Sequence, residues 1–150
     1  MKEDLFDYDT YTTCLARLDQ LHANTRPLWG KMSAAQMLAH CAAVQETTNG
    51  APLKKKTSLL LKVLKPMIKK MVVKGEYKQG EKTHPAYVQN SPKNFEQEKT
   101  RLLNALRVFH EMGPVKAEAI PHDFFGKMTA AEKGRAMFKH LEHHLQQFGV

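Results

Sequence analysis

Apolar residues recur every three or four positions in four stretches of the chain, which is the spacing of amphipathic α-helices. Met112–Pro114 should end the third of them, because glycine and proline are typical of helix C-termini. The pair Asn49-Gly50 should end the second for the same reason. The sequence therefore predicts an all-α fold. The four predicted helices cover about residues 9–23, 33–49, 93–112 and 130–148.

The segment between the second and third helices, about residues 50–92, is irregular. Its first part, Lys54–Lys74, is helix-like, but Pro66 interrupts it and proline breaks helix interiors. From Gly75 to Pro92, two glycines, two prolines and many polar residues indicate a long loop. Two helix pairs joined by such a connection predict a four-helix bundle with one long crossover, within a single domain of residues 1–150.

A short sequence is repeated before the second and fourth helices. Leu28–Gln36 is Leu-Trp-Gly-Lys-Met-Ser-Ala-Ala-Gln, and Phe124–Glu132 is Phe-Phe-Gly-Lys-Met-Thr-Ala-Ala-Glu. In each copy a Ser or Thr precedes a Gln or Glu by three residues, which is the pattern of a capping box. We therefore expect helices to begin after Ser33 and after Thr129. The match is too short to distinguish an internal duplication from two helices that begin with the same chemistry.

Positive charge is concentrated in one part of the chain. The formal net charge is +8, and eight lysines lie within Lys54–Lys74 with no acidic residue among them. Such a segment can contact nucleic acid or an anionic membrane surface. It has no arginine or interleaved aromatic residue, which argues against nucleic acid, and it lacks Trp or Phe anchors for a membrane. A solvated helix face is the simplest interpretation of these lysines.

The remaining composition is that of an ordinary globular protein, with 42% apolar residues. No apolar run approaches the roughly 20 residues that a membrane span needs. Met1–Asp4 carries acids where an export signal would be basic and then apolar, so we expect a cytoplasmic location. Cys14 and Cys41 form no CxxC pair and lie within apolar patterns, which indicates two reduced, buried thiols.

Histidines in two of the predicted helices are candidate metal ligands. His140 and His144 lie four residues apart, a spacing that places two imidazoles on one face of a helix. At about 100° per residue, His144 lies roughly 60° and His140 roughly 100° from the centre of the apolar stripe of the last helix. His143 lies about 160° away and should face solvent. His40 borders the apolar stripe of the second helix.

Three imidazoles on two facing helices could bind one divalent metal and leave a coordination position open for water, as in catalytic sites. From the spacing alone, however, histidines at the surface or at the edge of the core are the favoured interpretation, because eight histidines in 150 residues give such pairs by chance. Leu141 excludes the zincin motif, which needs Glu directly after the first histidine. Glu142 points near the solvent side and is interpreted as a surface charge.

These residues resemble the DinB/YfiT-like superfamily, and in particular an uncharacterised bacterial branch of it. Members of the superfamily carry one histidine late in the second helix and an HxxHH or HxxxH motif in the last helix. Here those are Met37–His40 and His140–His144, and the repeated aromatic-Gly-Lys-Met-Ser/Thr lead-in is similar to that branch. The resemblance covers nearly the whole chain, but the basic Lys54–Lys74 segment is not a general feature of the superfamily.

The resemblance implies a four-helix bundle in up-down-down-up order. It also implies a divalent metal ion, typically zinc or nickel, bound by His40, His140 and His144. Some superfamily members are S-transferases or isomerases that use low-molecular-weight thiols such as bacillithiol or mycothiol, with the metal holding the thiolate. Others have no known activity.

Three functional hypotheses follow. The first is a metal-dependent enzyme that acts on a small molecule, with a thiol cosubstrate or water in the open position and with no catalytic base identifiable from the sequence. In that case the basic crossover could bind an anionic substrate. The second is a non-catalytic binding module whose Lys54–Lys74 segment contacts an anionic partner or a membrane surface. The third is a bundle that keeps its histidines without activity, for example as a homodimer.

Overall fold

The fold is all-α, as the sequence predicts. The computed structural model describes residues 2–150, and within them we find five α-helices, a short 3₁₀-helix and no β-strand. None of these helices is both long and apolar enough to cross a membrane. The elements are α1 (Tyr8–Asp19), α2 (Ala34–Thr48), α3 (Leu59–Lys74), η1 (Pro85–Tyr87), α4 (Phe95–Ala119) and α5 (Ala130–Gln147).

The repeated sequence begins two helices in the same way, and both predicted capping boxes are confirmed. The Ser33 hydroxyl accepts a hydrogen bond from the Gln36 backbone N–H, and the Gln36 side chain accepts one from Ser33. Thr129 and Glu132 make the same pair of bonds before α5. These reciprocal bonds satisfy backbone donors that the first helical turn leaves free. They fix the start of the two helices that carry the candidate ligands.

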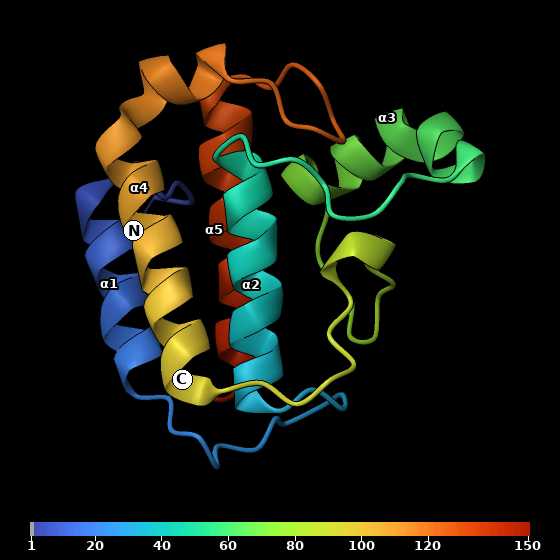
Figure 1. Cartoon of the computed structure of the whole chain (residues 1–150). Coiled ribbons are helices and arrows are strands. Elements are labelled where there is room, and N and C mark those ends of the chain that lie inside the picture. The colour runs from blue at the N-terminus through green and yellow to red at the C-terminus, as the bar shows by residue number, and fades with distance from the viewer. Residues whose placement is uncertain (1) are drawn as a thin grey trace.

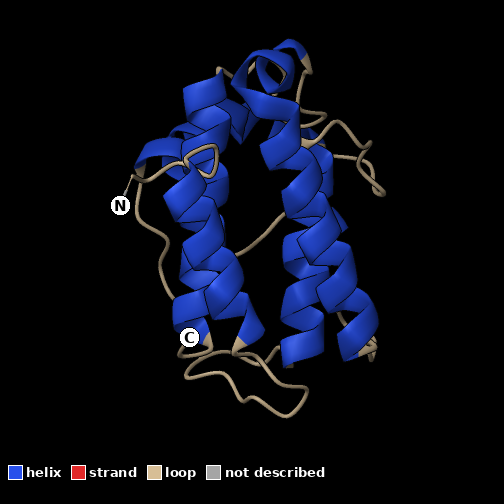
Figure 2. Ribbon diagram, turned by 90° about the vertical axis from the view of Figure 1, so that its left-hand side faces the viewer, coloured by secondary structure: helices blue, strands red, loops and turns tan. Residues whose placement is uncertain are grey.

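Four of the helices, α1, α2, α4 and α5, lie side by side, whereas α3 extends away from them (Figures 1 and 2). The most extensive contact between helices is that of α2 with α4. The Arg101 guanidinium binds the Glu46 carboxylate, and further along both helices the Asn49 amide donates to the Ala105 carbonyl. These contacts keep α2 and α4 in register along their length.

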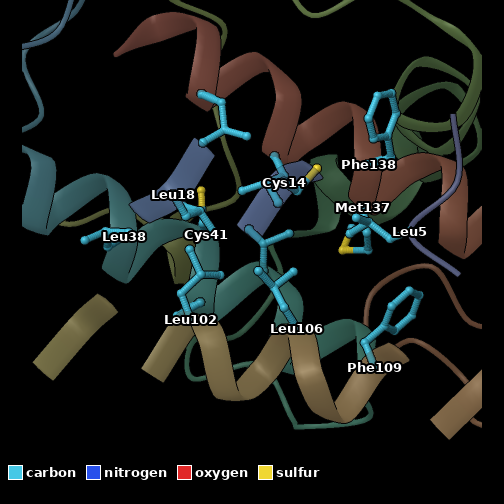
Figure 3. Packing of buried hydrophobic residues seen from close by; sticks show 14 of the residues in the cluster. Leu5, Cys14, Leu18, Leu38, Cys41, Leu102, Leu106, Phe109, Met137 and Phe138 are labelled. Atoms are coloured by element: carbon cyan, nitrogen blue, oxygen red, sulfur yellow. The ribbon is translucent and has the colours of Figure 1, made fainter. Parts of the chain in front are cut away.

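The core lies between the four packed helices. Leu18 and Cys14 from α1 and Leu38 and Cys41 from α2 belong to one buried cluster, to which α4 and α5 add further apolar side chains (Figure 3). Both cysteines are buried and free, as predicted from their apolar surroundings. Burying such side chains supplies the main driving force for folding. The α4 and α5 members labelled in Figure 3 are Leu102, Leu106, Phe109, Met137 and Phe138.

The crossover contains more helix than the sequence predicts. Helix α3 continues through Pro66, so the expected interruption there is wrong. Pro66 cannot donate to the Lys62 carbonyl one turn earlier, but both residues are exposed, so water can satisfy that oxygen. The remainder, residues 75–94, is a loop that contains only η1.

Gly113 bends α4 but does not end it. The glycine has φ 73° and ψ 168°, outside the helical region, and a further helical piece extends to Ala119. The predicted end at Met112–Pro114 is therefore a sharp kink. Proline is well suited to the first turn of a new helical piece, where its missing N–H costs nothing, and Pro114 occupies that position. The kink places Ala117 and Ile120 over the start of α5.

A buried lysine joins three helix ends. Lys133, in the first turn of α5, has no exposed surface. Its ammonium donates to the Thr48 carbonyl at 3.3 Å, the Ala117 carbonyl at 2.8 Å and the Ile120 carbonyl at 2.6 Å. The last carbonyls of a helix have no partner within the helix, and a cation there also suits the helix dipole. Lys133 thereby stabilises the C-terminal ends of α2 and α4 together.

Candidate metal centre

The three histidines selected from the sequence meet in the structure. His40 projects from α2, His140 and His144 project from α5, and all three are buried. One ring nitrogen from each lies within 4.8 Å of the others. The centroids of the three rings are 4.8 to 5.0 Å apart. The apolar stripes of α2 and α5 face each other, and they thus bring His40 next to His140 and His144, about a hundred residues later in the chain.

A backbone carbonyl fixes the orientation of the His40 ring. The Nδ1–H of His40 donates to the Tyr87 carbonyl at 2.9 Å, and a carbonyl can only accept. The proton therefore lies on Nδ1, and the lone pair on Nε2 faces the other two histidines. Tyr87 belongs to η1, so this short 3₁₀-helix of the crossover has a direct role at the site.

The His144 ring is held by a side-chain amide in the same way. The Gln147 amide nitrogen donates to the Trp29 carbonyl at 2.9 Å, which turns its Oε1 toward His144. The Nδ1–H of His144 donates to that oxygen at 2.8 Å. The His144 Nε2 is again left with its lone pair free. Hydrogen bonds of this kind to the distal nitrogen are typical of histidines that ligate metals.

The remaining contact joins the histidines to each other. The Nε2 atoms of His40 and His140 are 3.0 Å apart. Two nitrogen lone pairs at this separation repel unless they share a proton or a cation. Burial lowers the pKa of His40 and His140, and burial together with the His40 imidazole lowers the pKa of His144 to about 3. All three rings are therefore neutral near pH 7, as metal ligands must be, and the donor set fits a divalent ion such as zinc or nickel.

The histidines line one wall of a cavity of about 330 Å³. Helix α3 contributes Ile68, Met71 and Val72 to the wall, and the segment before α5 contributes Phe124 and Phe125. A mostly apolar cavity with a few convergent polar groups is typical of sites for small molecules. The arrangement can enclose a ligand of modest size directly beside the three imidazoles.

His143 does not face solvent, and that prediction is wrong. It is half-buried and lines the cavity, with its ring centroid 5.4 Å from that of Tyr77 and 5.9 Å from that of Trp29. The helical wheel places a residue only relative to the apolar stripe of its own helix. It could not show that the loop after α3 and the loop before α2 cover this side of α5. Glu142 pairs with Arg17 near the surface, in agreement with its interpretation as a surface charge.

Three further residues of the site were not identified from the sequence. Gln147 follows His144 by three residues, so it lies on the same helix face, and this spacing was a usable signal. Tyr87 acts through its backbone carbonyl, which no side-chain pattern reveals. Tyr77, whose ring centroid is 5.9 Å from that of His140, lies in a stretch where composition indicates only a loop.

His122, which also lines the cavity, should make the folded protein less stable in acid. Its Nδ1 accepts hydrogen bonds from the backbone N–H groups of Phe124 and Phe125, at 3.1 and 3.2 Å. Burial lowers its pKa from 6.5 to about 4. The unfolded chain therefore binds this proton more tightly than the folded protein. The stability that neutral His122 contributes is complete above about pH 6.5 and is lost as the pH falls through about 4.

Urea unfolding of wild type and His122→Gln at pH 7.5 and pH 5 measures this effect. Between the two pH values the wild type should lose about 2 kcal/mol more free energy of unfolding than the variant. The other buried histidines titrate in both proteins, so the comparison isolates His122. Equal losses would show that the folded state tolerates a proton on His122.

Comparison with known proteins places the chain in a family. The chain belongs to a family described as proteins of unknown function, DUF1569, whose model matches residues 1–149. No curated protein and no solved structure matches it. The family relationship therefore covers almost the entire chain and leaves the chemistry to be inferred from the site.

Proposed function

We propose that this protein is a metal-dependent enzyme of the DinB/YfiT-like type, in which His40, His140 and His144 bind zinc or nickel. The observation that carries the proposal is the pair of hydrogen bonds that fix the His40 and His144 tautomers. Both bonds place the protons on the outer Nδ1 atoms and leave the inner Nε2 atoms free. If these histidines only packed in the core, their free Nε2 lone pairs would not have to point toward one common position.

The arrangement of the helices supports the same relationship. The parallel contacts of α2 with α4 and the long connection between them agree with an up-down-down-up four-helix bundle. So does the meeting of one histidine from α2 with two from α5. The basic α3 departs from that plan, since such a segment is not a general feature of the superfamily.

The substrate we infer is a small, largely apolar molecule. The cavity beside the histidines has about the volume of a small ligand and is lined mainly by aliphatic and aromatic side chains. A divalent ion held by three imidazoles would act there as a Lewis acid, lowering the pKa of a water or a thiol. Tyr77 and His143 line the same cavity, and their polar atoms can bind the polar part of the substrate.

We favour transfer to a low-molecular-weight thiol over chemistry at a cysteine of the chain. Cys14 and Cys41 are both buried, and neither lines the cavity. Burial raises the pKa of Cys14 to about 11 and raises the pKa of Cys41 further. Both thiols stay protonated near pH 7 and are poor nucleophiles. A thiol nucleophile must therefore enter the cavity from solution.

Metal analysis tests the proposal. The purified wild type should contain close to one equivalent of a transition metal, and His144→Ala should contain little. His22→Ala is the matched control, because His22 is exposed and remote from the site. Assays of the metal-loaded protein with several low-molecular-weight thiols then address the reaction. Equal, negligible metal in all three proteins, even after incubation with zinc and nickel, would rule the proposal out.

Gln147 should act as a positioning residue for the metal. Gln147→Leu keeps the size of the side chain but removes both the bond to His144 and the bond to the Trp29 carbonyl. Loss of such an outer contact typically weakens metal binding by about 10- to 100-fold. Competition with a chelator measures the affinity. Gln146→Leu is the control, since Gln146 is exposed and contacts only Glu142; the same affinity in both variants would contradict the role of Gln147.

A further inference from the structure

Helix α3 has an apolar outer face that no other part of the structure covers. Its inner face packs on α5 and lines the cavity, as described above. On the outer face Leu59 is 78% exposed, Leu60 67%, Val63 69% and Met67 62%. Spacings of three and four residues place these side chains on one side of the helix. Four of the ten Leu, Val, Ile and Met side chains of α3 are therefore left exposed by the fold.

Lysines surround this apolar face. Residues 51–75 contain no acidic residue. Lys69 is the exception among the lysines, since it binds the Glu132 carboxylate and the Lys127 carbonyl on the bundle side. The others that are exposed have no acidic partner within this segment. They are Lys54, Lys55, Lys56, Lys62, Lys70 and Lys74.

The position of α3 makes the face accessible. In Figure 1 the helix extends to one side of the other four, with its first turns furthest from them. Leu59 and Leu60 lie in those first turns, and the Lys54–Lys56 cluster directly precedes them. The exposed side chains at the start of α3 therefore lie on the part of the helix that is furthest from the other four helices.

We propose that α3 docks the protein on an anionic lipid bilayer surface. An amphipathic helix in this setting places its apolar side chains among the acyl chains at the interface, while lysines bind the anionic headgroups. The four exposed aliphatic side chains would insert into the interface in place of the Trp or Phe side chains that often anchor such helices. The inference concerns a surface distinct from the metal centre, and its test does not require metal.

Two other occupants fit the face less well. A second copy of the chain would bring its own lysines against those of the first, and like charges at an interface repel. Nucleic acid would use the positive charge but not the apolar ridge, and the segment offers neither arginine nor aromatic rings for phosphates and bases. The combination of apolar and cationic groups favours a lipid surface.

Vesicle co-sedimentation of the full-length protein tests the proposal. Vesicles of phosphatidylcholine alone are compared with vesicles containing about one third phosphatidylglycerol, at low salt. The wild type should sediment with the anionic vesicles, and about 0.5 M NaCl should release it. The double variant Val63→Gln/Met67→Gln should bind at least about tenfold more weakly. Val115→Gln is the matched control, because Val115 is 86% exposed on α4, away from α3.

The outcomes separate the alternatives. Because all the substituted side chains are exposed, circular dichroism should show that each variant is folded. Failure of the wild type to bind, or equal binding by the double variant and Val115→Gln, overturns the proposal. A wild-type dimer in solution that the double variant converts to a monomer would assign the face to a second copy instead. Retained metal in the double variant would show that the two surfaces act separately.

Discussion

Lys133→Met should lower the free energy of unfolding by about 3 to 4 kcal/mol. Methionine fills a similar volume, so packing changes little. The carbonyls of Thr48, Ala117 and Ile120, however, would lose a cationic donor, and the bonds to Thr48 and Ala117 are buried. An unsatisfied buried acceptor costs about 1 to 3 kcal/mol. All three carbonyls lose the same donor together, although the Ala117 carbonyl keeps a hydrogen bond from the Ile120 N–H.

Urea unfolding followed by circular dichroism measures this loss, which corresponds to a fall of about 10 °C in the melting temperature. Lys116→Met is the control, because Lys116 is exposed on α4 and should change stability by less than about 0.5 kcal/mol. A loss below about 1 kcal/mol in Lys133→Met would mean that water or a backbone shift satisfies the carbonyls.

Addition of zinc to the metal-free protein should raise its melting temperature by about 5 to 10 °C. A ligand that binds only the folded state stabilises it by about 2.7 kcal/mol when present at a hundred times its dissociation constant. Neutral imidazoles that already converge need little rearrangement to accept the ion. The Nε2 atoms of His40 and His140, 3.0 Å apart, would bind the cation in place of the proton between them.

Differential scanning calorimetry with and without zinc provides the measurement, and the same experiment with nickel compares the two ions. His140→Ala should abolish the increase, because it removes one of the three candidate ligands. His22→Ala should retain it. An equal rise in wild type and His140→Ala would assign the metal effect to some other group.

The features predicted correctly from the sequence depend on local physics. The two capping boxes require only residues three positions apart, and both form as expected. The inward position of His40, His140 and His144 followed from helical periodicity, since a residue that borders an apolar stripe points toward the neighbouring helix. Their assignment as metal ligands came from the resemblance to the superfamily and stays a prediction. That periodicity brings the three rings together because α2 and α5 pack against each other.

The features that the sequence did not predict depend on contacts between distant segments. The environment of His143 is set by Trp29 and Tyr77, which lie on loops whose path no periodicity describes. The continuation of α3 past Pro66 depends on which side of the helix is exposed. The Tyr87 carbonyl that orients His40 is a backbone group, and any residue type could supply it.

Helix α3 forms a wall of the cavity and also part of the outer surface. Ile68, Met71 and Val72 face the cavity beside the histidines, while Val63 and Met67 point outward from the same helix. Thermodynamic linkage makes any coupling through such an element reciprocal. If a cavity ligand binds more tightly when α3 is held at a surface, the surface must bind the liganded protein more tightly by the same factor. Helix α3 is therefore positioned to make the binding of a ligand in the cavity depend on whether the protein is bound to a lipid surface.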